Sequence, residues 1–273
     1  MGISARIPLR VVGLGYLTAL LVAPLVYVCM QAFKDGFGAF WDAVSSPDAV
    51  HALRLTLTIA AIAVPANTIF GVAAALVLVR GRFRGKRLVW AFIDLPLALS
   101  PVVVGLSLVL LWGKNGWFGG WAQEHGVRVI FATPGMVLAT IMISLPFVAR
   151  EVAPVLREVG VEAEEAAATL GAGGAQTFLR ITLPAIRWGL IYGVILTTAR
   201  ALGEYGAVSV VSGHIAGETE TLTQHVDQRF QAFDLVGAYA ASLVLALLAV
   251  AAMALMGILN AKERRRWRSA SAE

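Results

Sequence analysis

Residues 164–184 read EEAAATLGAGGAQTFLRITLP, a polar stretch that is punctuated by glycines and lies between two apolar runs. Each flanking run is long enough to cross a membrane as a helix, which takes about 20 residues. A polar loop of this length between two membrane spans is expected to contact something outside the bilayer. The loop therefore decides how the rest of the chain is interpreted.

The order of alanines and glycines in this loop predicts two short helices. Residues 166–168 are alanines that favour a helix, whereas Gly171 and the glycines after it discourage its continuation. We therefore expect a helix that begins near Arg150 to end at Gly171. A second helix is expected to run from Ala175 towards Leu183.

The two ends of the loop differ in character. Glu162, Glu164 and Glu165 lie within one helical turn, on a surface suited to a basic or polar groove in a partner. At the other end, Pro184 marks the turn into the next apolar run. The loop is thus predicted to be a compact helix-turn-helix that projects from the membrane.

The composition requires an integral membrane protein. Hydrophobic residues make up 58% of the 273 residues and charged residues 14%, and the mean hydropathy is +0.76. Such a chain cannot keep its apolar surface from water as a globular domain. The net charge of +5 does not indicate nucleic acid, because the basic residues cluster in short loops between apolar runs. A single cysteine, Cys29, excludes an internal disulfide and a cysteine metal site.

Six apolar runs are long enough to span the bilayer, and none shows the alternating pattern of a barrel strand. We therefore predict an all-α integral membrane protein with one transmembrane domain over residues 1–273. The first run has no small-residue cleavage site after it and is expected to remain as a span. The expected spans cover residues 11–33, 55–79, 88–112, 129–149, 186–211 and 235–259. A loop at 150–185 and a basic tail at 260–273 complete the chain.

The distribution of basic residues predicts the orientation. Sixteen of the 22 Lys and Arg residues fall in the N-terminal segment, the second loop, the loop at 150–185 and the C-terminal tail. Five fall on the opposite side, and Arg200 lies inside the fifth span. Because basic residues accumulate on the cytoplasmic side, both termini and the loop at 150–185 are expected in the cytoplasm.

Fixed positions of the loop resemble the EAA loop of permeases from ATP-binding-cassette importers. The matching residues are Glu165, Ala166, Ala167, Gly171, Ile181, Leu183 and Pro184. This agreement in spacing disfavours a mere amphipathic connection. The resemblance implies a type I importer permease with six transmembrane helices, in which the loop is a coupling helix that sits in a cleft of a cytoplasmic ATPase subunit. ATP and Mg²⁺ would then be bound by the partner ATPase.

Motifs for chemistry are missing from the sequence. It has no G-x-x-x-x-G-K-[ST] phosphate loop, no H-E-x-x-H pair and no G-x-S-x-G elbow. We therefore expect no catalytic residue, metal site or bound cofactor in this chain. Movement of the loop would require a separate ATPase.

Two segments are candidates for the gate or path of an anion. Residues 94–108, DLPLALSPVVVGLSL, contain Ser100 and Pro101, and backbone amides freed at such a break suit an anion. A kinked packing helix accounts for the same residues. Arg200 and Glu204 are four residues apart and share one helix face. A charge near mid-membrane costs about 2.5–3.5 kcal/mol on insertion scales, so this pair is expected either at a gate or subunit interface or as a structural ion pair.

The fifth span and the segment after it narrow the resemblance. Residues 199–222, ARALGEYGAVSVVSGHIAGETETL, together with the loop, are similar to the W-type permease subunit of sulfate/thiosulfate importers. The T-type subunit shares a GE(F/Y)GAV segment, but VSGHIAGETETL fits the W type better. The resemblance implies transport by alternating access across a bacterial inner membrane. The implied partners are a T-type sister permease, two ATPase subunits and a periplasmic sulfate/thiosulfate-binding protein.

Two other functions remain open from the sequence, and a third is disfavoured. A permease for molybdate, tungstate or another oxyanion would share the same fold and loop. A secondary anion transporter would share the spans and the intramembrane arginine. An intramembrane enzyme needs a nucleophile or metal constellation that the sequence lacks.

Overall fold

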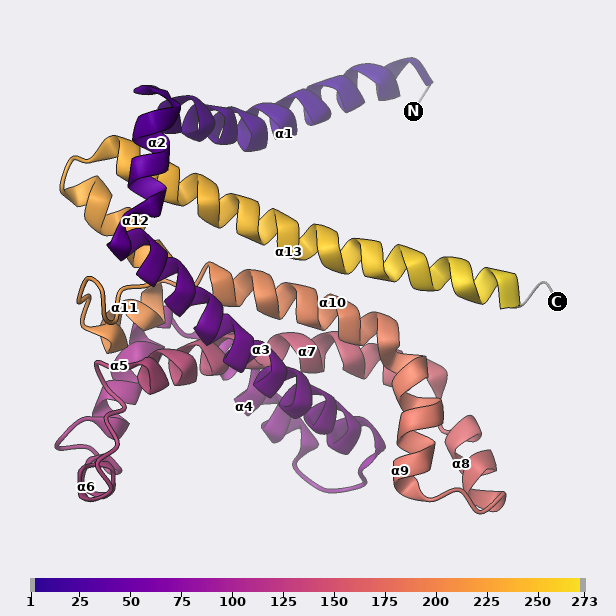
Figure 1. Ribbon diagram of the computed structural model, residues 1–273. Helices are drawn as coiled ribbons and strands as arrows, with labels where there is room; N and C mark the ends of the chain where they lie inside the picture. Colours follow the sequence, from indigo (N-terminus) through magenta and orange to yellow (C-terminus); the bar gives the residue numbers. More distant parts are fainter. Residues whose placement is uncertain (1–2, 271–273) are drawn as a thin grey trace.

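The computed structural model describes residues 3–270, and every regular element in this range is a helix (Figure 1). This confirms the predicted all-α class. The first seven helices are α1 (Ile3–Ala32), α2 (Gly36–Ser45), α3 (Pro47–Arg80), α4 (Lys86–Ala98), α5 (Pro101–Trp112), α6 (Gly119–Glu124) and α7 (Thr133–Val159). The remaining elements are α8 (Glu162–Thr169), α9 (Gly174–Thr177), the π-helix η1 (Phe178–Thr182), α10 (Leu183–Leu202), α11 (Gly206–Ser212), α12 (Leu222–Gln231) and α13 (Leu235–Ala270).

The number of possible membrane spans agrees with the sequence. Within the described residues, five helices are long and apolar enough to cross a membrane, and α4 with α5 makes a sixth if this bent pair is counted as one span. The predicted spans at 11–33, 55–79, 129–149 and 235–259 correspond to α1, α3, α7 and α13, with shifted ends. Residues 260–270 of the predicted tail continue α13 as a helix, and residues 271–273 lie outside the described range.

The predicted span over residues 88–112 consists of two helices, with the break at Ser100 and Pro101, where the sequence predicted a break or a kink. Helices α4 and α5 meet at an angle of 109°. Pro101 lacks a backbone N–H and restricts the residue before it to an extended conformation, and Ser100 has φ −62° and ψ 136°. The chain therefore turns at Leu99 and Ser100, and α5 starts anew at Pro101.

The predicted span at 186–211 is also incorrect as one helix. The helix ends at Leu202, and a separate short helix, α11, begins at Gly206. The carboxylate of Glu204 accepts a hydrogen bond from the backbone N–H of Ala207 at 2.8 Å, which stabilises the new helix start. The missing helical length is instead provided at the amino-terminal end, because the apolar helical segment runs from Gly174 to Leu202.

Helix α7 is central to the bundle and packs against both α3 and α10. At the contact, a Cβ atom added to Gly71 of α3 would lie 2.6 Å from Cβ of Val148, and one added to Gly193 of α10 would lie 2.8 Å from its Cα. Small residues allow helix backbones to approach this closely in membranes. Val148 is fully buried between the two neighbours.

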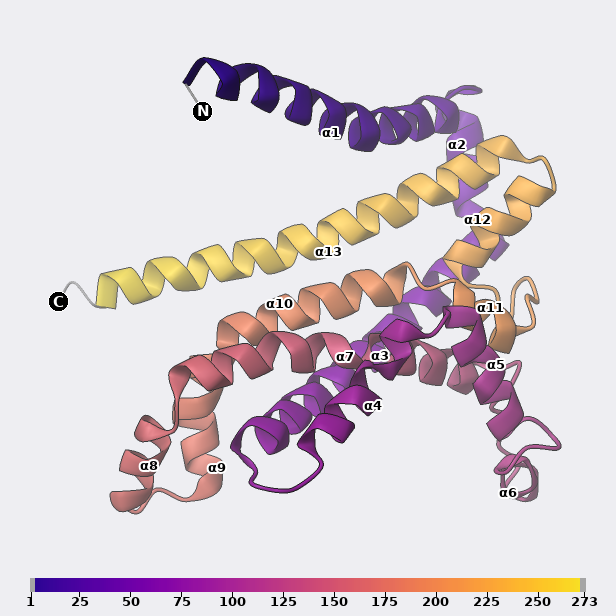
Figure 2. The same cartoon turned by 180° about the vertical axis from the view of Figure 1, so that it is seen from behind.

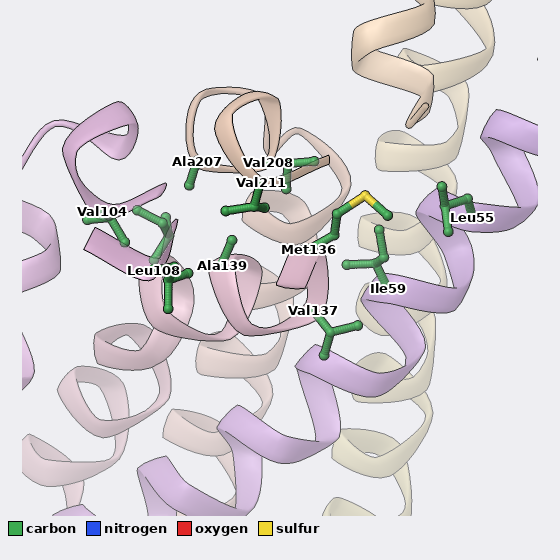
Figure 3. Close-up of a cluster of buried hydrophobic side chains, with 11 residues drawn as sticks. Leu55, Ile59, Val104, Leu108, Met136, Val137, Ala139, Ala207, Val208 and Val211 are labelled. Atoms are coloured by element: carbon green, nitrogen blue, oxygen red, sulfur yellow. The ribbon is translucent and has the colours of Figure 1, made fainter. Parts of the chain in front are cut away.

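A second part of the core joins the short helices to the long ones. The buried cluster in Figure 3 combines side chains from α3, α5, α7 and α11. Its labelled members are Leu55, Ile59, Val104, Leu108, Met136, Val137, Ala139, Ala207, Val208 and Val211. Helices α5 and α11 are thus held in the core after the breaks that precede them.

Several segments far apart in the sequence gather at one end of the molecule. The beginning of α1, the end of α13, the turn between α3 and α4, and helices α8 and α9 lie at this end in Figures 1 and 2. Helices α2, α6 and α12 lie at the opposite end (Figure 1). The positively charged segments of the sequence therefore share one end of the bundle.

Candidate functional site

Helices α8, α9 and η1 form a hairpin that projects from the bundle (Figure 1). We call residues 162–182 the α8–η1 hairpin. The prediction of one helix from Arg150 to Gly171 is wrong, because α7 continues to Val159 and the chain then turns at Gly160, which has φ +72°. Residues 150–159 of the predicted loop therefore belong to α7.

The predicted helix stop before Gly171 agrees with the structure. Gly171 has φ +83°, a left-handed conformation that side chains disfavour. The N–H of Gly171 donates to Ala168 O and that of Ala172 to Ala167 O, each at 3.0 Å. These two bonds are the Schellman motif, which satisfies carbonyls that a helix end otherwise leaves unpaired.

The second half of the hairpin leads directly into α10. Helix α9 begins at Gly174, one residue before the predicted start, and η1 continues it into α10 without an interruption. Pro184 lies in the first turn of α10, where its missing N–H is tolerated. The bend of the chain in this region is visible in Figure 1.

The predicted loop residues fall into two groups in the structure. Glu165, Ala166, Gly171 and Pro184 are exposed. Ala167 and Ile181 line a cavity of ≈ 280 Å³ between the two arms of the hairpin, which Gly171 also borders. Leu183 packs on the buried cluster formed by α3, α7 and α10. The first group therefore faces outward, and the others hold the hairpin together and attach it to the bundle.

Leu170, the residue before Gly171, is not among the loop residues that the sequence predicts to be functional. Its side chain is 88% exposed at the tip of the hairpin. This large apolar side chain at the tip is accessible to a partner. The signal that was available is its place directly before a glycine that ends a helix.

Arg200 and Glu204 meet as their spacing predicts. Their Nη2 and Oε2 atoms are 2.7 Å apart, and the side chains are 30% and 1% exposed. Besides binding Ala207 N–H, Glu204 accepts a hydrogen bond at its carbonyl from the Thr223 hydroxyl at 2.8 Å. The carboxylate of Glu204 is therefore engaged in local structure, whereas the guanidinium of Arg200 is the more accessible member of the pair.

The structure brings the two predicted path segments together. A Cβ atom added to Gly206, at the start of α11, would lie 2.8 Å from Cβ of Pro101 at the start of α5. Ser100 is exposed, and its hydroxyl does not cap α5. The two helix breaks thus adjoin each other, and the amino-terminal end of α5 lies beside the Arg200–Glu204 segment.

A helical bundle with five or six apolar spans and a protruding hairpin at its basic end defines a class of protein, the membrane-spanning permeases of ATP-binding-cassette importers. The sequence profile described as "Binding-protein-dependent transport system inner membrane component" matches residues 67–265. The chain belongs to this family, and within it to the CysW group of permeases.

Relatives cover nearly the whole chain. The sulfate transport system permease protein CysW of Synechococcus elongatus is 47% identical over 267 residues, 97% of this chain and 93% of the relative. Two permeases of Escherichia coli (strain K12) represent the two subunit types, and the chain can be compared with each. Its CysW is 45% identical over 91% of this chain and 86% of its own length, and its CysT is 39% identical over 85% and 84%. The greater similarity to CysW confirms the W-type prediction.

A solved structure confirms the fold. A chain in the crystal structure of a bacterial alginate ABC transporter, in complex with a periplasmic protein that carries an alginate pentasaccharide, superposes with a TM-score of 0.78. The superposition covers 92% of each chain at 19% sequence identity. The chain is thus a multi-pass membrane protein with the fold of an importer permease.

Proposed function

We propose that this chain is the permease subunit through which sulfate, and with it thiosulfate, crosses the bacterial inner membrane in an ATP-driven importer. The observation that carries this proposal is the identity of 47% and 45% to two sulfate permeases over nine tenths or more of the chain. Molybdate and tungstate are the competing cargoes. Selection among these oxyanions falls largely to the binding protein that delivers them.

The proposed assembly places two permeases side by side above two ATPase subunits. The T-type sister permease completes the membrane path, the ATPases bind ATP and Mg²⁺, and a periplasmic protein delivers the anion. Both termini and the α8–η1 hairpin face the cytoplasm in this arrangement. Support comes from the accumulation of Lys and Arg in the segments that share this end of the bundle.

We assign docking on the ATPase to the tip of the α8–η1 hairpin. Leu170 would insert into an apolar cleft, with Glu165 and Ala166 beside it, and Gly171 would fix the turn that displays it. Burial of a leucine side chain contributes about 1.5–3 kcal/mol, enough to make it an anchor of the contact. Ala167, Ile181 and Leu183 would hold the hairpin in the orientation that docking requires, and Pro184 would mark the start of α10.

We assign the anion path to the adjoining helix breaks. The amino-terminal end of α11 is already occupied by the carboxylate of Glu204, so the amides available to an anion are those at the start of α5, next to Ser100 and Pro101. Arg200 supplies positive charge nearby, and Glu204 holds its guanidinium in place. Alternating access would expose this region first to the periplasm and then to the cytoplasm.

The test is complementation of a bacterial strain that lacks its own W-type permease. The expected result is that the chain restores uptake of radiolabelled sulfate, and that thiosulfate competes with this uptake more strongly than molybdate. Restored uptake of molybdate with none of sulfate would assign the other cargo. Sulfate uptake that persists after removal of the ATPase would instead indicate a secondary transporter.

A further inference from the structure

The end of α3 is attached to the end of α7 through one arginine. Nη1 of Arg80, the last residue of α3, donates to the carbonyl oxygen of Leu156 at 3.0 Å, and Nη2 donates to that of Gly160. Leu156 lies in the last turn of α7, where carbonyls have no partner inside the helix. Arg80 therefore caps α7, and its positive charge is favourable at this end of the helix dipole.

The same arginine contacts the α8–η1 hairpin. Its Nη2 donates to Oε1 of Glu164 at 3.2 Å, and its Nε lies 3.2 Å from Oε2. The hydroxyl of Thr182, in η1, donates to Oε1 of Glu164 at 2.9 Å. Glu164 of α8 is thereby joined to α3 on one side and to the helix that becomes α10 on the other.

These contacts are well placed to carry force, because α8 packs mainly on the other arm of its own hairpin. The helix contains no buried side chain, so packing alone does not fix it against the bundle. Its covalent connection to α7 passes through Gly160, whose backbone conformation favours glycine. The two charged side chains are 20% and 22% exposed, which limits screening by water.

Neighbouring glutamates of α8 therefore face different ways. Glu164 points into the molecule towards Arg80 and Thr182. Glu165 is exposed. The sequence predicts one acidic surface for both glutamates, and the structure separates them.

We propose that Arg80, Glu164 and Thr182, which we call the Arg80 link, transmit movement of α8 to the membrane spans. The inference rests on the proposed function, in which an ATPase displaces the hairpin. Displacement of α8 would pull Arg80 and so the ends of α3 and α7, while Thr182 passes the same movement to α10. Arg80 and Glu164 are positioning residues in this scheme, since neither needs to touch the anion or ATP.

The experiment measures coupling in the complete importer, reconstituted in proteoliposomes with its ATPases, sister permease and sulfate-loaded binding protein. Glu164→Gln removes the charge and keeps the size of the side chain. We expect the complex to assemble normally and to hydrolyse ATP within about twofold of the wild type, while sulfate imported per ATP falls about tenfold. Glu158→Gln is the matched control, because Glu158 is an exposed glutamate in the last turn of α7, outside the α8–η1 hairpin, and it should leave this ratio unchanged.

A parallel loss of import and hydrolysis, or no loss of either, would overturn the Arg80 link. Thr182→Val supplies a second variant that removes one hydrogen bond and no charge, and it should lower the same ratio by about threefold with normal assembly. An unchanged ratio in this variant would also count against the link. Failure of the wild-type complex to import sulfate with ATP would contradict the proposed function instead.

Discussion

The α8–η1 hairpin and the adjoining helix breaks at α4–α5 and α10–α11 are stabilised in different ways. The turns of the hairpin depend on local features, a Schellman motif at Gly171 and the glycine conformation at Gly160, and Leu170 is exposed at the tip. The breaks also start from local features, at Pro101 and at the Glu204 cap of α11, but distant contacts then hold them, such as that of Glu204 with Thr223 and the approach of Gly206 to Pro101. The difference teaches that nearby residues are enough to shape the turns of the hairpin, whereas the helix breaks also need the packed bundle.

The largest expected effect is at the tip of the hairpin. Gly171→Val places a β-branched residue in a left-handed conformation, which costs about 1–3 kcal/mol and disrupts the Schellman motif. Sulfate uptake should be abolished while the protein remains in the membrane, as measured by uptake and immunoblotting of membranes. Gly173→Ala is the control, because Gly173 has φ −73° and open space around it. Equal loss in both variants would refute the need for the left-handed turn.

A smaller effect is expected at Leu170. Leu170→Ala removes most of the apolar surface that the proposed docking buries, so affinity for the ATPase should fall about tenfold. The measurement is co-purification of the ATPase over a range of salt and detergent conditions. Leu247→Ala, at an exposed leucine of α13, should have no effect on this contact. Normal co-purification of the Leu170 variant would remove this residue from the docking surface.

At the helix breaks we expect a substitution to lower the free energy of unfolding more than the amount of sulfate imported per ATP. Glu204→Ala removes the ion pair with Arg200 and the cap of α11, which should lower the free energy of unfolding by about 2 kcal/mol. Thermal unfolding in detergent measures this loss. Glu204→Gln retains an acceptor for Ala207 N–H and should recover part of the stability. If both variants unfold like the wild type yet fail to transport sulfate, Glu204 contributes to the anion path itself and not only to stability.

The smallest effect is expected at Ser100. Because its hydroxyl does not cap α5, Ser100→Ala should change the stability by less than about 0.5 kcal/mol and uptake by less than about twofold. Concentration-dependent sulfate uptake is the measurement. A rise in the apparent KM of about tenfold with unchanged stability would place the hydroxyl in contact with the anion.

The contrast also explains what the sequence predicted. Hydropathy and length identified the spans, and the alanine and glycine pattern identified the end of α8, because both depend on neighbouring residues. A break near Ser100 and Pro101 was predicted, but its sharp angle was not. The end of the helix at Leu202 was not predicted, since the apolar run continues through Gly203 and the contacts of Glu204 come from α11 and α12. Gly160 was overlooked because helix-forming residues surround it. The role of Arg80 was invisible, because Leu156 and Glu164 are far from it in sequence.

The close packing of α7 has a mechanical consequence. Val148, held between Gly71 and Gly193, lies near the middle of α7 and leaves little room for sliding at that point. The helix is then expected to tilt about this residue as a pivot. At about 1.5 Å per residue, the part towards Val159 is about 16 Å long and the part towards Thr133 about 22 Å. A push on the shorter part is then expected to give a larger displacement in the opposite direction at the far end of α7.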